Sequence, residues 1–216
     1  MTSEQTPPGR SPSPRRVGPI GGDMASVVAG LAQRARLPAL QQRHSSTAVL
    51  GLFSFVNGVV SIALMSAAAW ATGQPLIFPS LGPTAFLLFY TPTQPSASPR
   101  NTLCGHLIGA AAGYGSLVAF GLTDAGPALA HGVTPARVGA AALSLGLTSG
   151  LMAWLKVPHP PAGATTLIVS LGILHTPTQL GVLMVAVALL AGQGLVINRL
   201  AGVDYPWWSP RPAPPS

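Results

Sequence analysis

Residues 157–174 read VPHPPAGATTLIVSLGIL, in which a start rich in proline and glycine leads into a short apolar stretch. Residues 75–90, PLIFPSLGPTAFLLFY, repeat this order. Each apolar part is shorter than the about 20 residues that an α-helix needs to cross the hydrocarbon layer of a membrane. Proline and glycine interrupt regular helix, so both segments are predicted to be broken elements with a short helix after the break.

Four continuous apolar segments flank the two broken elements. Each is long enough to span a bilayer as one helix. They cover Thr47–Ala71, residues 102–122, about 138–155 and about Leu180–Asn198. The predicted fold class is therefore all-α, a polytopic transmembrane helix bundle.

A fixed offset of 81 residues aligns the two broken elements, since it places Gly82 on Gly163 and Thr84 on Thr165. The same offset carries the two spans of the first half onto those of the second. We therefore predict two repeats, each made of a span, a broken helix and a second span. If the broken elements cross the membrane, there are six passes and the repeats are inverted; if they are re-entrant, four passes remain.

The composition favours a membrane protein over a soluble domain or a nucleic-acid-binding protein. Hydrophobic residues make up 48% of the 216 residues and charged residues 7%, with a mean hydropathy of +0.48. A soluble domain has about 25% charged residues. Six of the eleven Lys and Arg residues lie in the first 43 positions and the others are scattered, which is typical of a topology signal.

The basic residues also predict how the chain is oriented. With six passes, Arg100, Lys156, Arg199 and both tails share one side, and Arg137 lies opposite. The positive-inside rule then places both termini in the cytoplasm, and we expect a bacterial inner-membrane protein. A re-entrant arrangement would move Arg100 and Lys156 to the outside, so the positive-inside rule favours six passes and inverted repeats.

Three regions are predicted along the chain. Residues 1–46 form a disordered basic tail, for which a targeting segment and an interfacial helix near Met24–Leu40 are alternatives. Residues 47–200 form the transmembrane domain, and residues 201–216 form a tail rich in proline and tryptophan.

The broken elements suggest a binding site for an anion. No Asp or Glu lies in an apolar segment, which argues against carboxylate proton relays and cation sites. A helix starting after each glycine would present free backbone N–H groups and the positive end of a helix dipole. The alternative is that proline and glycine only kink packed helices. The predicted substrate-binding residues are Ser80, Gly82, Thr84, His106, His159, Gly163, Thr165 and Thr166, with Arg100 and Lys156 gathering anions at the mouth.

Two histidines stand out among these residues. His159 is set between prolines beside a predicted helix start, and a hydrogen-bonded cap is the alternative to a ligand role. His106 lies on a face with Gly105, Gly109 and Gly113, whose four-residue spacing predicts close helix packing or homo-oligomerisation. No metal site, cofactor or enzyme is expected, because the sequence lacks metal-ligand spacings and hydrolase motifs such as Gly-x-Ser-x-Gly.

Four ordered blocks make the sequence similar to the HPP family of integral membrane proteins, named for its His-Pro-Pro motif. The blocks are PSLGPTAFLLF at residues 79–89, SPRNTLCGH at 98–106, HPPAGATTL at 159–167 and YPWW at 205–208. The resemblance covers about residues 47–208. It implies a small protein with four transmembrane helices, and nitrite transport is the activity assigned to chloroplast and cyanobacterial members.

We therefore expect a transporter or channel for a small monovalent anion, with nitrite as the substrate. The alternative is a membrane scaffold that binds a partner and transports nothing. Transport predicts that Thr84, His159 and Thr165 converge on a wet cavity, whereas a scaffold predicts that they are buried in mutual hydrogen bonds. The lipid bilayer and a small inorganic anion are the expected partners, and nucleic acid is not.

Overall fold

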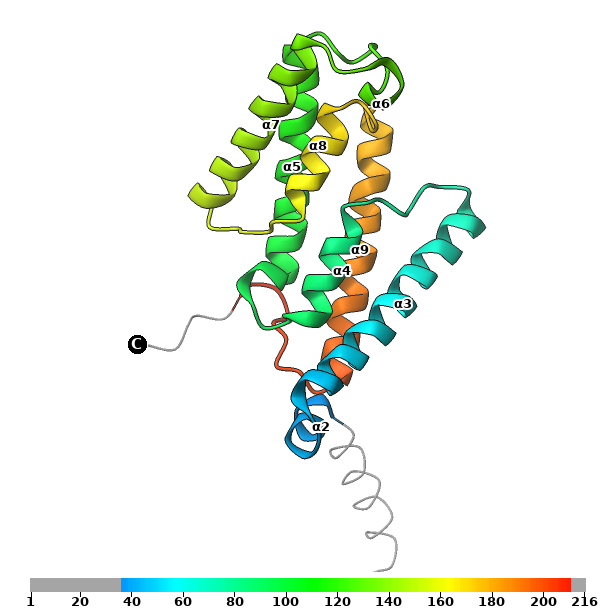
Figure 1. The fold of residues 1–216 in the computed structure, drawn as a ribbon, viewed down its shortest axis with the longest axis vertical. Helices are drawn as coiled ribbons and strands as arrows, with labels where there is room; N and C mark the ends of the chain where they lie inside the picture. The colour runs from blue at the N-terminus through cyan, green and yellow to red at the C-terminus, as the bar shows by residue number, and fades with distance from the viewer. Residues whose placement is uncertain (1–35, 211–216) are drawn as a thin grey trace, which may run out of the picture.

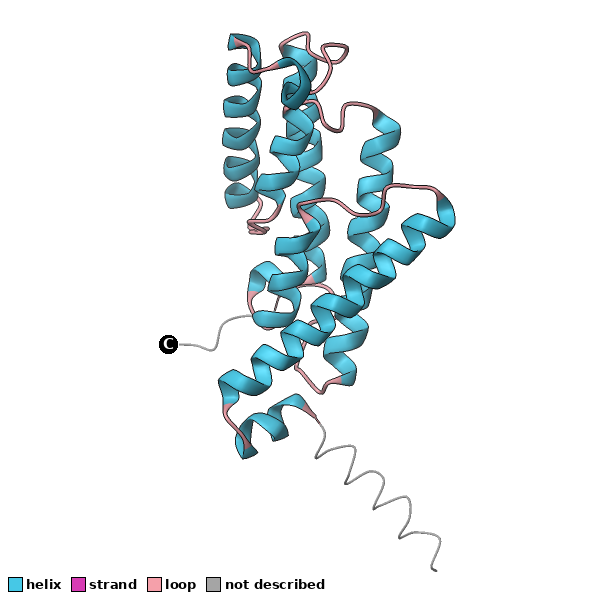
Figure 2. Ribbon diagram, turned by 45° about the vertical axis from the view of Figure 1, so that its right-hand side comes forward, coloured by secondary structure: helices cyan, strands magenta, loops and turns pink. Residues whose placement is uncertain are grey.

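The computed structural model describes residues 36–210 as an elongated bundle, and every regular element in this range is a helix (Figures 1 and 2). Within these described residues four helices are long and apolar enough to cross a membrane, which confirms the predicted polytopic all-α class. The long helices are α3 (Ser46–Thr72), α5 (Pro99–Ala119), α7 (Pro135–Trp154) and α9 (Pro177–Leu200), and the shorter elements are α2 (Leu37–Arg43), α4 (Leu81–Tyr90), the 3-10 helix η1 (Pro95–Ala97), α6 (Ala128–His131) and α8 (Ala162–Ser170).

Helices α5, α7 and α9 share one type of start. Ser98, Thr134 and Thr176 are N-cap residues whose hydroxyls accept the backbone N–H of the third helical residue, and a proline follows each of them. Proline is favoured at the first helical position because that residue needs no N–H. These helices begin three residues before the apolar segments predicted for them, since the apolar pattern omits the capped first turn.

Helices α4 and α8 are the short helices predicted after the breaks. They contain 10 and 9 residues, which corresponds to about 15 and 14 Å at 1.5 Å per residue. Irregular segments at residues 73–80 and 155–161 lead into them. The helices begin at Leu81 and Ala162, 81 residues apart, in agreement with the predicted offset.

Successive elements alternate in direction along the bundle. In Figure 1, α3, α5 and α8 run upward, whereas α4, α7 and α9 run downward. Helix α2 and the described end of the chain lie toward the lower end, and α6 lies at the upper end. Helices α4 and α8 begin at mid-height and run to opposite ends. This order is the one that six passes require, while the number of passes and the inverted repeat remain predictions.

Helix α5 lies at the centre of the bundle and packs against α7, α8 and α9. A Cβ added at Gly105, Gly109 or Gly113 would lie 2.6–2.7 Å from the nearest atom of residues 159–169. The close packing predicted for this glycine face is therefore confirmed, and it occurs within one chain. Because residues 159–169 cover these three glycines, they are not free to contact a second copy of the chain. Homo-oligomerisation through other glycine-rich helix faces remains a prediction.

Large apolar side chains cover much of the outer surface. Phe55 and Leu64 of α3 are 69% and 53% exposed, and Val185 of α9 is 55% exposed. A continuous apolar surface of this kind is unfavourable in water. It is typical of helices whose backbone groups are satisfied internally and whose side chains face lipid, so the lipid bilayer is the surroundings of this bundle.

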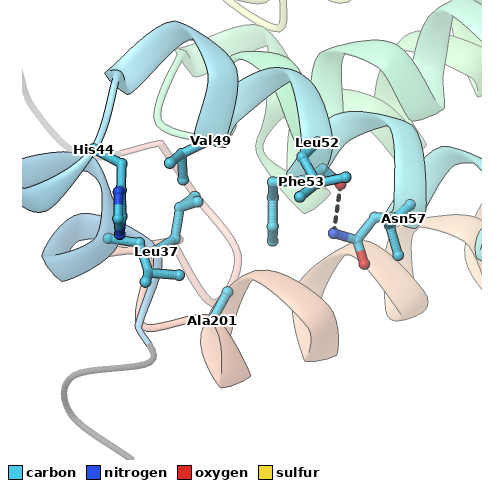
Figure 3. A pocket seen from close by; sticks show the side chains of 9 residues that line it. Leu37, His44, Val49, Leu52, Phe53, Asn57 and Ala201 are labelled. Atoms are coloured by element: carbon cyan, nitrogen blue, oxygen red, sulfur yellow. Dashed lines mark hydrogen bonds between the residues drawn. The ribbon is translucent and has the colours of Figure 1, made fainter.

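Helix α2 corrects the predicted extent of the disordered tail. Residues 37–43 are helical, and Leu37 anchors this helix to the bundle, since its backbone N–H donates to the carbonyl of Ala201 at 2.9 Å and its side chain is buried. The rest of the predicted tail, residues 1–35, lies outside the described residues. Between α2, the start of α3 and the end of α9 is an apolar pocket of about 410 Å³ (Figure 3).

The segment after α9 folds back on the lower end of the bundle. The Tyr205 side chain is fully buried and its hydroxyl donates to the carbonyl of Ala97. Burial raises the pKa of Tyr205 above its ordinary value. The Arg199 guanidinium lies 3.9 Å above the ring of Trp207. The tryptophan-rich tail is therefore ordered as far as residue 210.

Candidate functional site

The first turns of α4 and α8 meet at His106 of α5. His106 Nε2 lies 2.9 Å from Thr84 Oγ1, and His106 Nδ1 lies 2.7 Å from Thr165 Oγ1. Each threonine is the fourth residue of its short helix, so the two occupy equivalent positions at the offset of 81. One histidine thus bridges the two broken elements.

His159 completes this group. Its Nε2 lies 3.2 Å from His106 Nε2 and 3.4 Å from Thr84 Oγ1. Its Nδ1 lies 2.8 Å from the carbonyl oxygen of Ser96. The side chains of Thr84, His106, His159 and Thr165, which we call the His–Thr cluster, are fully buried.

The partners of each ring assign the protons of the cluster. The Ser96 carbonyl can only accept, so His159 carries its proton on Nδ1 and its Nε2 accepts. His106 Nε2–H then donates toward His159 Nε2 and Thr84 Oγ1, while the Thr84 hydroxyl donates to the carbonyl of Ser80. His106 Nδ1 accepts the Thr165 hydroxyl. Every ring nitrogen of a neutral pair is satisfied by this arrangement.

The electrostatic surroundings of the cluster are set by the two short helices. Their amino-terminal turns, the positive ends of the helix dipoles, contact His106 from opposite halves of the bundle (Figure 1). Within residues 36–210 the carboxylates are Asp124 and Asp204, and both lie outside the helices. The cluster therefore combines positive dipole ends with neutral donors and acceptors.

The backbone amides at the start of α8, which were predicted to be free, are engaged, and this corrects the expected form of that half of the site. The N–H groups of Ala162, Gly163 and Ala164 donate to the carbonyls of residues 159–161 at 2.9–3.1 Å, and Leu81 N–H donates to residue 78. The turn before each helix is closed by its own hydrogen bonds between residues three apart. These amides are therefore not available to a ligand in this conformation.

Other predicted site residues fall into two groups. Ser80 and Thr166 are fully buried, and their hydroxyl oxygens have no hydrogen-bond partner. Gly82 is exposed with no atom within 4 Å of an added Cβ, and Gly163 is half-buried and faces Leu145 of α7. Neither glycine points into the cluster, because the face that each helix presents to His106 carries the threonine.

The two predicted mouth residues lie outside the cluster. Lys156 is exposed in the turn that follows α7. Arg100 is half-buried in the first turn of α5, where its backbone N–H donates to the carbonyl of Trp208 at 3.1 Å. Both are separated in sequence from the cluster residues by only a few positions.

Arg137 and Ser96 are important residues that the sequence reasoning missed. Arg137 is 2% exposed, and its guanidinium donates to the carbonyls of Ser170 and Gly126, with the Ser170 bond at 3.0 Å. It therefore holds the carboxyl end of α8. Arg137 could have been found in the sequence because it is a single arginine at the start of an apolar span. Ser96 acts through its backbone carbonyl, so no pattern of side chains indicates its role.

The cluster meets the criterion expected of a scaffold and one part of the criterion expected of transport. Thr84, His159 and Thr165 converge, as transport predicts, but they are fully buried and sealed by mutual hydrogen bonds, as a scaffold predicts, and do not open together on a wet cavity. A cavity of about 400 Å³ lies on the α7 side of His159. Among the described residues no third His, Cys, Asp or Glu joins the two histidines in a group that could hold a metal ion.

Comparison with known proteins agrees with this membrane architecture. A transmembrane protein of Dictyostelium discoideum is 30% identical over 166 residues, which are 73% of this chain and 54% of that protein. A second transmembrane protein of the same organism is 32% identical over 118 residues, 54% of this chain and 34% of that protein. This chain thus matches about half and about a third of the lengths of these relatives. No solved structure matches it.

The family comparison covers the whole bundle. The family described as HPP, transmembrane region, matches residues 41–206. This range runs from α2 to the residue after the buried Tyr205 and includes all four members of the His–Thr cluster. The chain therefore belongs to the HPP transmembrane family and is an integral membrane protein.

Proposed function

We propose that this chain is a transporter or channel that carries a small monovalent anion, with nitrite as the substrate, through the His–Thr cluster. The observation that carries the proposal is the meeting of two helix amino termini at one buried group of donors without a carboxylate. The proposal adds that the protein lies in a bacterial inner membrane with both termini in the cytoplasm, and that it needs no cofactor and is not an enzyme.

The helix dipoles supply an electrostatic reason for an anionic substrate. Each helix amino terminus is equivalent to about half a positive charge. Helices α4 and α8 direct these ends at His106 from opposite halves of the bundle. A negative ion at the cluster would be stabilised from two directions, as at the broken helices of other transporters, whereas a cation would be repelled.

The hydrogen bonds of the cluster suggest how an anion and a proton would move together. The neutral network has one N–H group between the two histidines, so a second proton there would place two N–H groups 3.2 Å apart and face to face. If the two rings moved apart, an anion between their Nε2 atoms would remove this conflict, because it accepts a hydrogen bond from each ring. When the anion and the added proton have left, the neutral hydrogen-bond network would form again.

On this proposal the sealed cluster is the closed state of the site. The hydroxyls of Thr84 and Thr165 would turn from their present acceptors, the Ser80 carbonyl and His106 Nδ1, to donate to the anion. The exposed Lys156 and the half-buried Arg100 would raise the local anion concentration at the cytoplasmic mouth.

A membrane scaffold is the second candidate function, and the completeness of the cluster's hydrogen bonds favours it. A fully satisfied buried polar network makes a packing arrangement specific without any ligand. In that case His106 would serve to hold α4 and α8 in register, and the protein would act through a bound partner.

The experiment that tests the proposal is nitrite uptake by liposomes that contain the purified full chain. We expect wild-type protein to load nitrite faster than protein-free liposomes, and His106→Gln and His159→Gln to lower the rate at least tenfold. Thr47→Val is the matched control, because Thr47 is exposed at the start of α3 and far in sequence from the cluster. Correctly folded wild-type protein that loads no more nitrite than protein-free liposomes would exclude nitrite transport and favour the scaffold.

A further inference from the structure

A cavity of about 400 Å³ lies between α7 and the segment that leads into α8. Its lining includes Thr148, Ser149 and Met152 from the last turns of α7, and His159 and Gly163 from the other side. His159 also belongs to the cluster and is fully buried. The histidine therefore forms part of the wall between this cavity and the cluster.

Thr148 brings an unused hydrogen-bonding group to the cavity. The residue is 1% exposed, and its buried Oγ1 has no hydrogen-bond partner. Some hydroxyls elsewhere in the bundle, such as those of Ser66 and Thr72 in α3, donate to the carbonyl four residues earlier. Others, such as those of Ser116 and Ser170, are buried without a partner as Thr148 is, and Thr148 differs from these two because it lines a cavity. Burial of a hydroxyl without a partner is unfavourable, so Thr148 is suited to a ligand that supplies the missing bond.

Gly163 keeps the cavity open without being required by packing. A Cβ at this position would meet only Leu145 Cδ1, at an ordinary contact distance of 3.6 Å. At Gly109, by contrast, an added Cβ would lie 2.7 Å from a backbone oxygen. Packing therefore explains glycine at position 109 but not at position 163, where a side chain would take up cavity space.

Lys156 is an exposed cation in the turn between the lining residues Ala153 and Pro158, and its backbone is strained. It has φ 54° and, among the described residues, is the one non-glycine residue with positive φ. Its N–H donates to the carbonyl of Ala153, and the N–H of Val157 donates to that of Met152, in a helix ending that favours glycine. A cation in the preceding turn would interact equally well with the helix dipole, so the dipole does not explain a lysine in this conformation.

We infer that this cavity, the α7 vestibule, binds the small oxyanion before it reaches the His–Thr cluster. The Thr148 hydroxyl would donate to the ion, and Lys156 would attract it from the aqueous side. Movement of His159, which separates the vestibule from the cluster, would then admit the ion to the site between the two rings. This inference rests on the proposed function, because it assigns the route to the same site.

Thiol labelling tests the vestibule without relying on transport. In a Cys104→Ala background, we expect Ser149→Cys to react with a negatively charged, membrane-impermeant methanethiosulfonate, and nitrite to slow the reaction at least threefold. Gln94→Cys is the matched control, since Gln94 is exposed in the turn after α4; it should react without protection by nitrite. Absence of labelling at position 149, or labelling that nitrite does not slow, would overturn the inference.

Uptake kinetics separate failure of the inference from failure of the proposed function. Thr148→Val and Lys156→Asn should raise the KM for nitrite at least threefold and leave the maximal rate within twofold of wild type. Asparagine tolerates the left-handed backbone, so Lys156→Asn removes charge without adding strain. If wild-type protein transports nitrite but neither KM changes, the vestibule is wrong and the proposed function stands. If position 149 is protected by nitrite but wild-type protein does not transport, the vestibule stands and transport is wrong.

Discussion

Replacement of Gly109 by alanine tests the contact between α5 and α8 that holds the cluster together. The added Cβ would lie 2.7 Å from the carbonyl oxygen of Ala162 and 3.4 Å from the backbone nitrogen of Thr166. Both neighbours are backbone atoms of α8, so a side-chain rotation cannot relieve the collision. Helix α8 must move away from α5 by about 0.7 Å to restore an ordinary contact.

The size of the effect follows from two opposing terms. Forcing an extra methyl group into a packed contact destabilises a protein by about 1–3 kcal/mol, whereas alanine gains about 1 kcal/mol over glycine in a helix. Gly115→Ala is the matched control, because it is on the same helix, exposed, and has no atom within 4 Å of an added Cβ. We therefore expect Gly109→Ala to be about 1–3 kcal/mol less stable than Gly115→Ala.

Thermal unfolding in detergent, followed by circular dichroism, measures this difference. At about 2–4 °C per kcal/mol for a chain of this size, Gly109→Ala should unfold about 2–12 °C below Gly115→Ala. The shift of α8 should also lengthen the 2.7 Å contact between Thr165 and His106 and slow nitrite uptake. Equal unfolding temperatures for the two variants would refute the packing described here.

Further predictions concern the two ends of the bundle. Arg137→Met should lower the free energy of unfolding by about 2–4 kcal/mol in chemical denaturation, because two buried carbonyls lose a charged donor; a loss below about 0.5 kcal/mol would contradict this role. Because burial raises the pKa of Tyr205, its stabilising effect is present below pH about 10 and is lost as pH rises above that value. Wild-type stability should therefore fall more steeply above pH 10 than that of Tyr205→Phe, and parallel curves would exclude a buried phenol. In membrane vesicles lacking Cys104, cysteines at Gln42, before α3, and at Gln94, after α4, should label from the same side, and labelling from opposite sides would refute six passes.

The sequence was sufficient to predict the broken elements and the residues that meet. Prolines and glycines mark where regular helix stops, and the offset of 81 pairs Thr84 with Thr165, the two threonines that contact His106. These features depend on local backbone chemistry and on periodicity. The broken elements and the paired threonines can therefore be predicted without knowledge of how the helices pack.

The parts that were not predicted depend on packing and on local turns. The amides of Ala162 and Gly163 are engaged because the turn before α8 closes on itself, and helix-start signals do not reveal that closure. The sealing of the cluster depends on which rotamers the two histidines adopt. The role of Arg137 depends on carbonyls more than ten and thirty residues away in the chain, which no local pattern identifies.

The length of α4 and α8 has a consequence for how the protein enters its membrane. Helices of 10 and 9 residues cover about half of a hydrocarbon layer about 30 Å thick, so neither can leave the translocon for lipid as an independent span. Their preceding irregular segments would expose peptide groups to lipid unless neighbouring helices cover them. Each short helix must therefore enter the membrane together with the long helices on which it packs, which are α3 and α9 for α4, and α5 and α7 for α8.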